Sequence, residues 1–568
     1  MASLTPKSGV LGRRNAAHLL RRTGFGPTKA EIDTFSDLTV DQALTNLMQV
    51  PPLPAPPIDP ETGATWVING REDGVNSGDS RLSDYVAGWW MVEAMDPNQT
   101  VLLPKMIFFL HTCFSTNFDN LDSEDNYYLL RLFRHYAYGS YKTFARKVSL
   151  DGGMMEYLDL RSSNKFNPNE NYPRELLELF TIGKGPQIGF ENYTTYTEDD
   201  IRAAARVLTG FRQNSDWWDT NLHDPDTGLP TGILKPDSHD TDDKVFSDAF
   251  VSPDFPSPVT IVGGETEADM LRELDTLIHM IFEQDATALN ICRKMYRFFV
   301  HYDITEEVET DIIVPLANTL KSNDYNLGMT IETLLKSEHF FDEDGTIPEE
   351  HHIGAIIKTP VELVLGVIRF FKAQLPDPNG DLDDYYRVWM RDTVMNFMFN
   401  ESGMLLFQPP TVAGYQPYHE EPEYARLWIS SNTLPFRYTM AEMFTKGKKV
   451  TRGGDLHMNI DVIQMVTDQS IIPDFTGPDP LDGIVGTYTG GRFADHIVRC
   501  ITDYAFPDPP AQERFDYFLN DLLLGNLSLI NWRNEWMEFE ATGDDSNIRP
   551  QLELFIQGIL QSPEFQLA

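Results

Sequence analysis

Apolar residues recur at the spacing of an α-helix along most of this chain, and this periodicity limits the fold more than any other feature. Strand-like alternation is confined to Val259–Val262, with a small β element expected within 445–490. We therefore predict a mainly α protein, a large multi-helix globular body with long loops and little β structure. The helical stretches are 11–22, 28–48, 81–160, 197–208, 267–301, 306–340, 353–374, 384–400 and 491–567.

Proline, glycine and charge divide the chain into five predicted parts. Residues 51–60 are so rich in proline that they must be extended, and residues 61–80, rich in Gly, Asn, Asp and Ser, predict a long surface loop after them. The parts are an N-terminal basic helical segment (1–50), a proline- and glycine-rich connector (51–80), a helical core domain (81–440), an irregular insertion (441–490) and a C-terminal helical segment packed on the core (491–568).

The composition excludes several functional classes. The 86 acidic and 45 basic residues give a formal charge of −41, which repels nucleic acid and anionic lipid, and which suits solubility or cation binding. Three distant cysteines predict neither a disulfide framework nor a structural zinc site. No apolar run is long enough for a membrane span, and no signal peptide is visible. By sequence alone, we expect a cytoplasmic protein.

The residues from Asn167 to Gly183 predict a helix with polar side chains gathered at its start. Pro173 suits a first helical turn, and Gly183 can adopt the left-handed conformation that often ends a helix. A helical wheel places apolar residues on one side, namely Leu176, Leu177, Leu179 and Phe180. The opposite side collects Arg174, Glu175, Glu178 and Thr181.

The carboxylates of this stretch have two interpretations. Glu175 and Glu178 are about 60° apart around the helix, and Glu170 precedes it and can fold back toward its start. Clustered carboxylates suit a divalent cation such as calcium or magnesium, or acid–base catalysis if one pKa is raised. The alternative is structural: Arg174 pairs with Glu178 at i,i+4, which is worth roughly 0.2–0.5 kcal/mol, and Glu170 caps the helix.

Histidines supply the remaining candidates. His111 lies in an apolar helix, where an imidazole needs a partner, and it is our third candidate catalytic residue beside Glu175 and Glu178. His239 and Asp240 lie in a polar loop, and with Glu170, Glu175 and Glu178 they form the predicted metal-ligand set. Each histidine can equally be a satisfied structural residue. The spacings of zincins, di-iron helices, P-loops, dinucleotide folds and serine hydrolases are absent from the sequence.

Several motifs, taken together and in order, resemble the bacterial domain-of-unknown-function 1800 family. The resemblance covers nearly the whole chain, but it departs from the family pattern at Cys113, where a second histidine is common, and at Tyr415, where tryptophan is usual. The cysteine at position 113 argues against a metal site built from two histidines on the helix that carries His111. The motifs are Ala17–Pro27, Phe109–Thr116, Tyr157–Asp159, Asn169–Phe180, Ala203–Gly210, Lys294–Val300, Lys358–Leu363, Gln408–Tyr415 and Leu560–Phe565.

The resemblance implies a context rather than a reaction. Members are often encoded beside a sulfatase- or phosphatase-like protein, which implies an envelope or extracellular role in polysaccharide or ester metabolism. Two hypotheses follow: a metal-assisted hydrolase or accessory enzyme, with a divalent cation as possible cofactor, or a non-catalytic scaffold or partner of that sulfatase- or phosphatase-like protein. A third possibility, carbohydrate binding, rests on the Trp217–Trp218 pair.

Overall fold

Helices make up most of the regular structure in the computed structural model, which describes residues 2–68, 79–96, 99–190, 192–344, 355–377, 380, 382–449 and 457–568. The mainly α fold class is confirmed. No described helix is both long enough and apolar enough to span a bilayer. The first helices are α1 (Gly12–Thr23), α2 (Lys29–Ser36), α3 (Val40–Leu47), α4 (Asp79–Met95), α5 (Leu103–Cys113), α6 (Ser123–Tyr136), α7 (Tyr141–Val148), α8 (Gly152–Tyr157) and α9 (Asn171–Glu175).

The rest of the chain is also helical, and it includes several wider π-helical turns. The α-helices are α10 (Glu198–Val207), α11 (Glu267–Glu283), α12 (Asp285–Phe299), α13 (Glu306–Val308), α14 (Val314–Ser322), α15 (Leu327–Lys336), α16 (Pro360–Phe370), α17 (Thr433–Lys446), α18 (Val462–Thr467), α19 (Ala494–Ala505), α20 (Gln512–Asp516), α21 (Leu529–Thr542) and α22 (Arg549–Gln561). The π-helical segments are η3 (Leu176–Phe180), η7 (Glu309–Ile313), η9 (Asp383–Phe399) and η13 (Tyr517–Leu523), and short 3₁₀ turns include η10 (Gln416–Tyr418) and η11 (Tyr424–Trp428).

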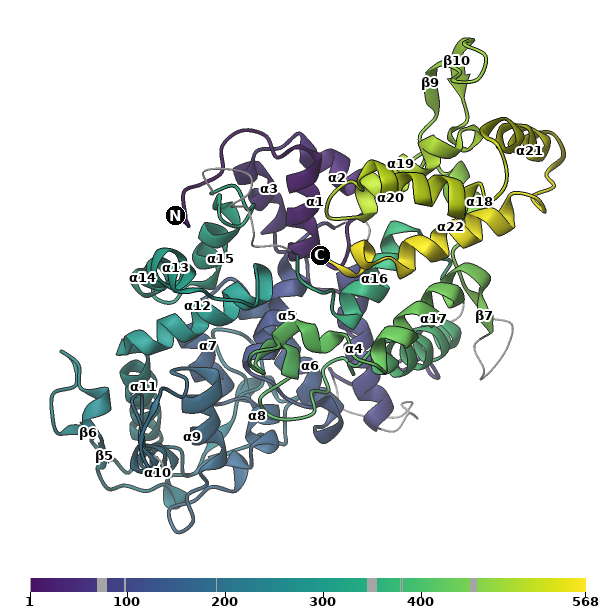
Figure 1. Ribbon diagram of the computed structural model, residues 1–568. Helices are drawn as coiled ribbons and strands as arrows, with labels where there is room; N and C mark the ends of the chain where they lie inside the picture. Colours follow the sequence, from purple (N-terminus) through teal and green to yellow (C-terminus); the bar gives the residue numbers. More distant parts are fainter. Residues whose placement is uncertain are drawn as a thin grey trace.

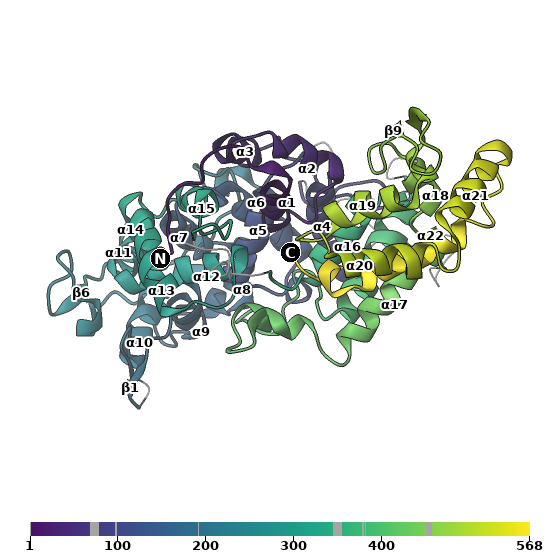
Figure 2. The same cartoon turned by 45° about the horizontal axis from the view of Figure 1, so that its top comes forward.

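The described strands form antiparallel pairs only. The predicted strand near Val259 is confirmed as β6, and two hairpins lie in the predicted insertion. Hairpin β9–β10 projects from the body beside α21, as both views show (Figure 1, Figure 2). The pairs are β1 (Gln187–Gly189) with β2 (Asn192–Tyr193), β3 (Phe211–Arg212) with β4 (Ile233–Leu234), β5 (Lys244–Phe246) with β6 (Val259–Ile261), β7 (Lys448–Lys449) with β8 (His457–Met458), and β9 (Phe475–Pro478) with β10 (Val485–Tyr488).

Local chemistry explains where the helices begin and end. Threonines at 28, 39, 197, 266 and 359 each close a capping box, in which the hydroxyl accepts from the third helical N–H and that residue's side chain bonds back. The box at Thr197 starts α10, in agreement with the helix predicted over residues 197–208. Gly183 and Gly210 have φ of +79° and +81°, the left-handed conformation expected after a helix.

One hydrophobic cluster runs through the described residues from Leu11 to Phe565, and it includes residues from all five predicted parts. The ends of the chain meet in this packing, because Arg21 of α1 donates to the Phe506 carbonyl at 2.7 Å and Tyr504 of α19 donates to Asp33 at 2.6 Å. The boundaries of the five parts stay a prediction.

The connector 51–80 departs from the surface loop expected after Pro60. Trp66 and Val67 are fully buried, and the Trp66 indole donates to Ser123 at 3.0 Å. An aromatic side chain of this size anchors the segment by the apolar area it buries. Residues 69–78 of the connector and 450–456 of the insertion lie outside the described residues.

Candidate functional site

A pocket of about 200 Å³ lies where four distant parts of the chain meet. Its walls are the end of α5, the end of η3, one face of α12 and the loop from Val412 to Tyr424. Helices α5 and α12 contact each other, and η10 of the loop contacts α12. Each wall includes or directly adjoins a motif quoted for the family resemblance. The loop from Val412 to Tyr424 and the end of the helix that follows Glu170 therefore line the same pocket.

The end of the helix within residues 167–183 forms one wall of this pocket. Its first turns are α-helical, but residues 176–180 widen into a π-turn, a form that is frequent at functional sites. Gly183 then reverses the chain, and its N–H donates to the Leu177 carbonyl at 2.9 Å. A Cβ at Gly183 would lie 3.1 Å from the Asn290 side chain, which donates to the Thr181 carbonyl at 2.8 Å. Glycine thus lets α12 approach the helix end closely.

Two cations of α12 line the pocket one turn apart. Lys294 donates to the Leu179 carbonyl at the open end of η3, and burial, reinforced by Arg297, lowers the pKa of its ammonium. The Arg297 guanidinium lies over the Tyr424 ring at 4.8 Å, and its Nη2 is 3.9 Å from a Glu421 oxygen. Its buried Nε has no hydrogen-bond partner among the described residues. A buried donor left without a partner is costly unless something accepts from it.

Groups that can transfer protons face these cations. Glu178 accepts from Lys184 at 2.8 Å and from the Tyr196 hydroxyl at 3.0 Å. His419 also lines the pocket, and burial lowers its pKa, so the neutral imidazole dominates at neutral pH. Burial raises the pKa of the Cys113 thiol, which therefore stays protonated.

The lining of the pocket is richer in basic side chains than the protein as a whole. It includes three basic residues (Lys184, Lys294 and Arg297) and two carboxylates (Glu178 and Glu421), whereas the chain carries a formal charge of −41. Basic side chains gathered in a hollow of a strongly acidic protein can hold a small anion against the overall field. The arrangement can hold an anionic group and move a proton beside it.

Glu175, predicted as catalytic, lies on the same helix as Glu178 but does not line the pocket. It is half-buried, and no hydrogen bond or ion pair satisfies its carboxyl group among the described residues. Burial, together with the Glu178 carboxylate, raises its pKa from 4.5 to about 7. Glu175 is therefore a proton donor or acceptor near neutral pH.

We expect Glu175→Gln to stabilise the protein above pH 7 and to have little effect below pH 4.5. The unfolded carboxyl loses its proton near pH 4.5 but the folded one near 7, so the stability of the wild type falls as the pH rises between these values. After allowance for solvent screening, the gain is about 1 kcal/mol at pH 8. Thermal unfolding at both pH values measures it. Glu442→Gln, at an exposed carboxylate paired with Lys446, should show no such pH-dependent gain.

Glu170 and Arg174 belong to an ion-pair network at the start of the helix. Arg174 binds both oxygens of Glu198 on α10, at 2.6 and 2.7 Å, and it donates to Glu170 at 3.3 Å. The expected Arg174–Glu178 pair is wrong, because Glu198 offers a better-placed bidentate partner. The helical wheel puts Thr181 on the polar side, but this residue is fully buried and donates to the Leu176 carbonyl.

His111 is enclosed in the aromatic core. Its Nε2 donates to the Thr116 carbonyl at 3.1 Å, and its ring lies edge-on to Phe407 at 4.8 Å. Burial lowers its pKa to about 3, so the imidazole is neutral. The structure places it apart from the residues that line the pocket. A catalytic role for His111 stays a prediction that this geometry does not support.

His239 and Asp240 lie in a second closed network. Both ring nitrogens of His239 are occupied, by the Thr209 carbonyl at 2.8 Å and by Glu273 at 3.2 Å. Asp240 accepts from Arg206 at 2.7 and 3.1 Å. Of the five predicted ligands, no three offer ligand atoms within 4.8 Å of one another in the described chain. These residues do not form a metal-binding set.

Two groups of potential metal ligands that were not predicted from the sequence come together in the structure. The side chains of Asp122, Asp125 and Glu156 meet on one side of α6, and those of Asp254, His279 and Glu283 meet beside α11. His279 is held by Lys142 at 2.9 Å and by Asp254 at 3.0 Å. The sequence signals for these clusters are the spacing of three residues between Asp122 and Asp125 at the start of α6 and that of four residues between His279 and Glu283 on α11.

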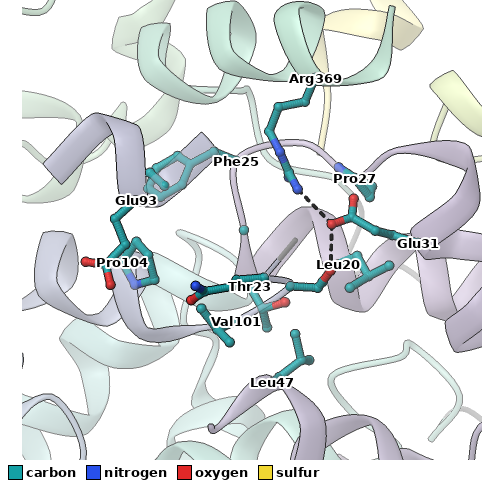
Figure 3. A pocket seen from close by; sticks show the side chains of 14 residues that line it. Leu20, Thr23, Phe25, Pro27, Glu31, Leu47, Glu93, Val101, Pro104 and Arg369 are labelled. Carbon is teal, nitrogen blue, oxygen red and sulfur yellow. Dashed lines mark hydrogen bonds and ion pairs between the residues drawn. The ribbon is translucent and has the colours of Figure 1, made fainter. Parts of the chain in front are cut away.

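A small pocket near Phe25 is structural (Figure 3). Arg369 reaches down from α16 to Glu31 at 2.7 Å, and Thr100 donates to the same oxygen at 2.6 Å. The space is about 20 Å³, enough for a single water molecule. The polar groups here tie the N-terminal helices to α16.

The pocket residues Lys294, Arg297 and His419 were not among the sequence candidates. Lys294 and Arg297 appeared only within a motif that was quoted for the resemblance. Their spacing of three residues places both on one helical face, which is the signal that could have identified them.

Comparison with known proteins agrees with the resemblance. The family model described as "Protein of unknown function (DUF1800)" matches residues 18–567. No curated protein and no solved structure matches the chain. Since the match covers nearly the whole sequence, the chain belongs to the DUF1800 family.

Proposed function

We propose that this protein is an enzyme that binds a small anionic substrate in the pocket between α5, η3 and α12. The observation that carries the proposal is the buried Arg297 Nε, a donor without an acceptor, beside Lys294, a basic side chain without a carboxylate partner among the described residues. A carboxylate, sulfate or phosphate group supplies the missing acceptor. Arg297 then holds the anion, and Glu178 and His419 transfer protons at the adjoining atoms.

An anionic substrate is consistent with the first of the two hypotheses drawn from the sequence. An anionic ester or acidic polysaccharide unit presents the group that such a pocket takes, in agreement with a hydrolase or accessory enzyme of polysaccharide or ester metabolism. The predicted metal ligands do not fit a divalent cation, because Glu170 and Asp240 are paired with arginines and His239 has no free nitrogen. The proposal therefore contains no step through a metal.

Arg297→Gln is expected to weaken anion binding at least about tenfold, since a hydrogen bond to a charged group is worth about 1.5–3 kcal/mol. Calorimetric titration of the wild type and the variant with sulfate, phosphate and acetate measures the change. Arg293→Gln is the matched control: Arg293 lies one turn earlier on α12 and is paired with Glu309 at 2.5 Å. Equal affinities in all three proteins would overturn the proposal.

The alternative, a non-catalytic scaffold or partner of a sulfatase- or phosphatase-like protein, is favoured by one observation. Glu170, His239 and Asp240 all join separate elements through ion pairs or hydrogen bonds, as structural residues do. This alternative would be selected if the protein co-purified with such a protein and showed no calorimetric binding of sulfate, phosphate or acetate. Carbohydrate binding stays a separate proposal: Trp218 is half-exposed, and Trp217 packs against Tyr128 with ring centres 5.8 Å apart.

A further inference from the structure

Lys294 differs from the other basic residues of the pocket in its surroundings. Lys184 has a carboxylate partner and a half-exposed side chain, whereas Lys294 contacts the Leu179 carbonyl and lies in the field of the Arg297 cation on the same helix. An amine that is buried next to another cation holds its proton weakly. Such a lysine can act as a nucleophile toward carbonyl carbon at neutral pH.

The Leu179 carbonyl fixes the direction of this amine. The last turn of a helix leaves its carbonyls without intrahelical donors, and Leu179 is the penultimate residue of η3. One N–H of Lys294 is used there, which leaves the rest of the nitrogen available to the pocket that this side chain lines. The contact limits the rotation of a long side chain and positions it before substrate enters.

We propose that Lys294 forms an imine with the carbonyl carbon of a small 2-oxo acid or aldehyde acid whose carboxylate is held by Arg297. The inference rests on the proposed anion binding and names the substrate class for the same pocket. The pocket of about 200 Å³ suits a compound of a few carbon atoms. Arg297 lies one helical turn from Lys294, so one substrate can reach both side chains.

The chemistry balances with the residues present. The neutral Lys294 nitrogen attacks the carbonyl carbon, and the oxygen takes a proton to give a carbinolamine. The nitrogen then loses a proton, the carbinolamine hydroxyl takes one and leaves as water, and the C=N bond forms. The nitrogen finally loses its second proton to give the neutral imine, so that two protons pass from nitrogen to oxygen in all. Glu178 or His419 carries these protons, and no oxidant or reductant is needed.

Reductive trapping with glyoxylate tests this proposal. Glyoxylate carries an aldehyde and a carboxylate on adjacent carbons, and sodium cyanoborohydride reduces its imine to a stable carboxymethyl-lysine. We expect the intact protein to gain one carboxymethyl group and the adduct to map to Lys294. Each unit of lowered pKa leaves roughly tenfold more free amine at neutral pH, so Lys294 should react before surface lysines.

Lys294→Arg keeps a donor for the Leu179 carbonyl but cannot form the imine, and it should lose the adduct. Lys446→Arg, at an exposed lysine of α17, should retain it. Arg297→Gln should reduce the labelling about tenfold, since it removes the guanidinium that binds the carboxylate of glyoxylate. Labelling spread over surface lysines, or unchanged in Lys294→Arg, would overturn the imine.

Calorimetry with glyoxylate, without reductant, separates this inference from the proposed function. Binding that depends on Arg297 but leaves no adduct at Lys294 overturns the imine and preserves the anion pocket. Absence of binding to glyoxylate, acetate, sulfate and phosphate overturns both. A folded Lys294→Arg variant with unchanged thermal unfolding shows that a lost adduct does not reflect misfolding.

Discussion

Glu362→Gln is expected to lower the free energy of unfolding by about 3–5 kcal/mol, the usual cost of leaving buried charge without its partner. Glu362 lies in the first turn of α16 and binds Lys105 of α5. Its charge also stabilises the ionised forms of Arg22, Lys358 and Arg437, all of them buried. Burial lowers the pKa of Lys358 to about 7 even with this carboxylate present.

Glu362→Gln removes the negative charge of this side chain but keeps its shape and one acceptor oxygen. A glutamine oxygen can still accept from the Thr359 N–H, at 2.8 Å in the capping box of α16, so the cap survives while the counter-charge is lost. Asp269→Asn is the matched control, because Asp269 closes the same box at the exposed start of α11. Denaturant and thermal unfolding should show a large loss for Glu362→Gln and a much smaller one for Asp269→Asn. Equal losses would show that Glu362 acts only as a cap.

The second large effect is expected for Gly26→Ala. Gly26 has φ of +95°, and a Cβ there would lie 2.3 Å from the Gly366 Cα in the middle of α16. Two backbones touch at this point, and the Gly26 carbonyl accepts from Arg369. The left-handed conformation costs roughly 1–2 kcal/mol for alanine, and forced repacking adds roughly 1–3 kcal/mol. We expect a total loss of about 2–5 kcal/mol in unfolding free energy.

Gly12→Ala separates the two contributions. Gly12 also has a left-handed φ, +66°, but a Cβ at this position would have no neighbouring atom within 4 Å. Its substitution should cost the conformational part alone, roughly 1–2 kcal/mol. The same unfolding measurements compare the two variants. If Gly26→Ala lowered the free energy of unfolding no more than Gly12→Ala does, this would contradict the close contact between the α1–α2 loop and α16.

The fold could be predicted from local signals because most helices carry them. Thr197 with Asp200 predicts the start of α10, and Gly210 predicts the turn after it. The connector was harder: its composition predicts a surface loop, but Trp66 finds a buried site against α6. Only tertiary packing decides whether an isolated aromatic residue is covered.

The candidate site could be predicted only in part, because its residues come from distant parts of the chain. Glu178 was found from its own helix, but the cations opposite it belong to α12, more than a hundred residues later. The Arg174 partner was assigned within the helix, whereas the better partner, Glu198, approaches from α10. Spacing along one helix identifies neighbours on that helix and gives no information about its tertiary contacts.

The pocket between α5, η3 and α12 is the proposed binding site of a small anion. A crystal structure of the protein grown with selenate, with anomalous data at the selenium edge, tests this proposal most directly. We predict an anomalous peak within hydrogen-bond distance of Arg297 Nε and beside Lys294, a peak that is lost in crystals of Arg297→Gln. An empty pocket at saturating selenate, or a peak unaffected by that substitution, would contradict the account.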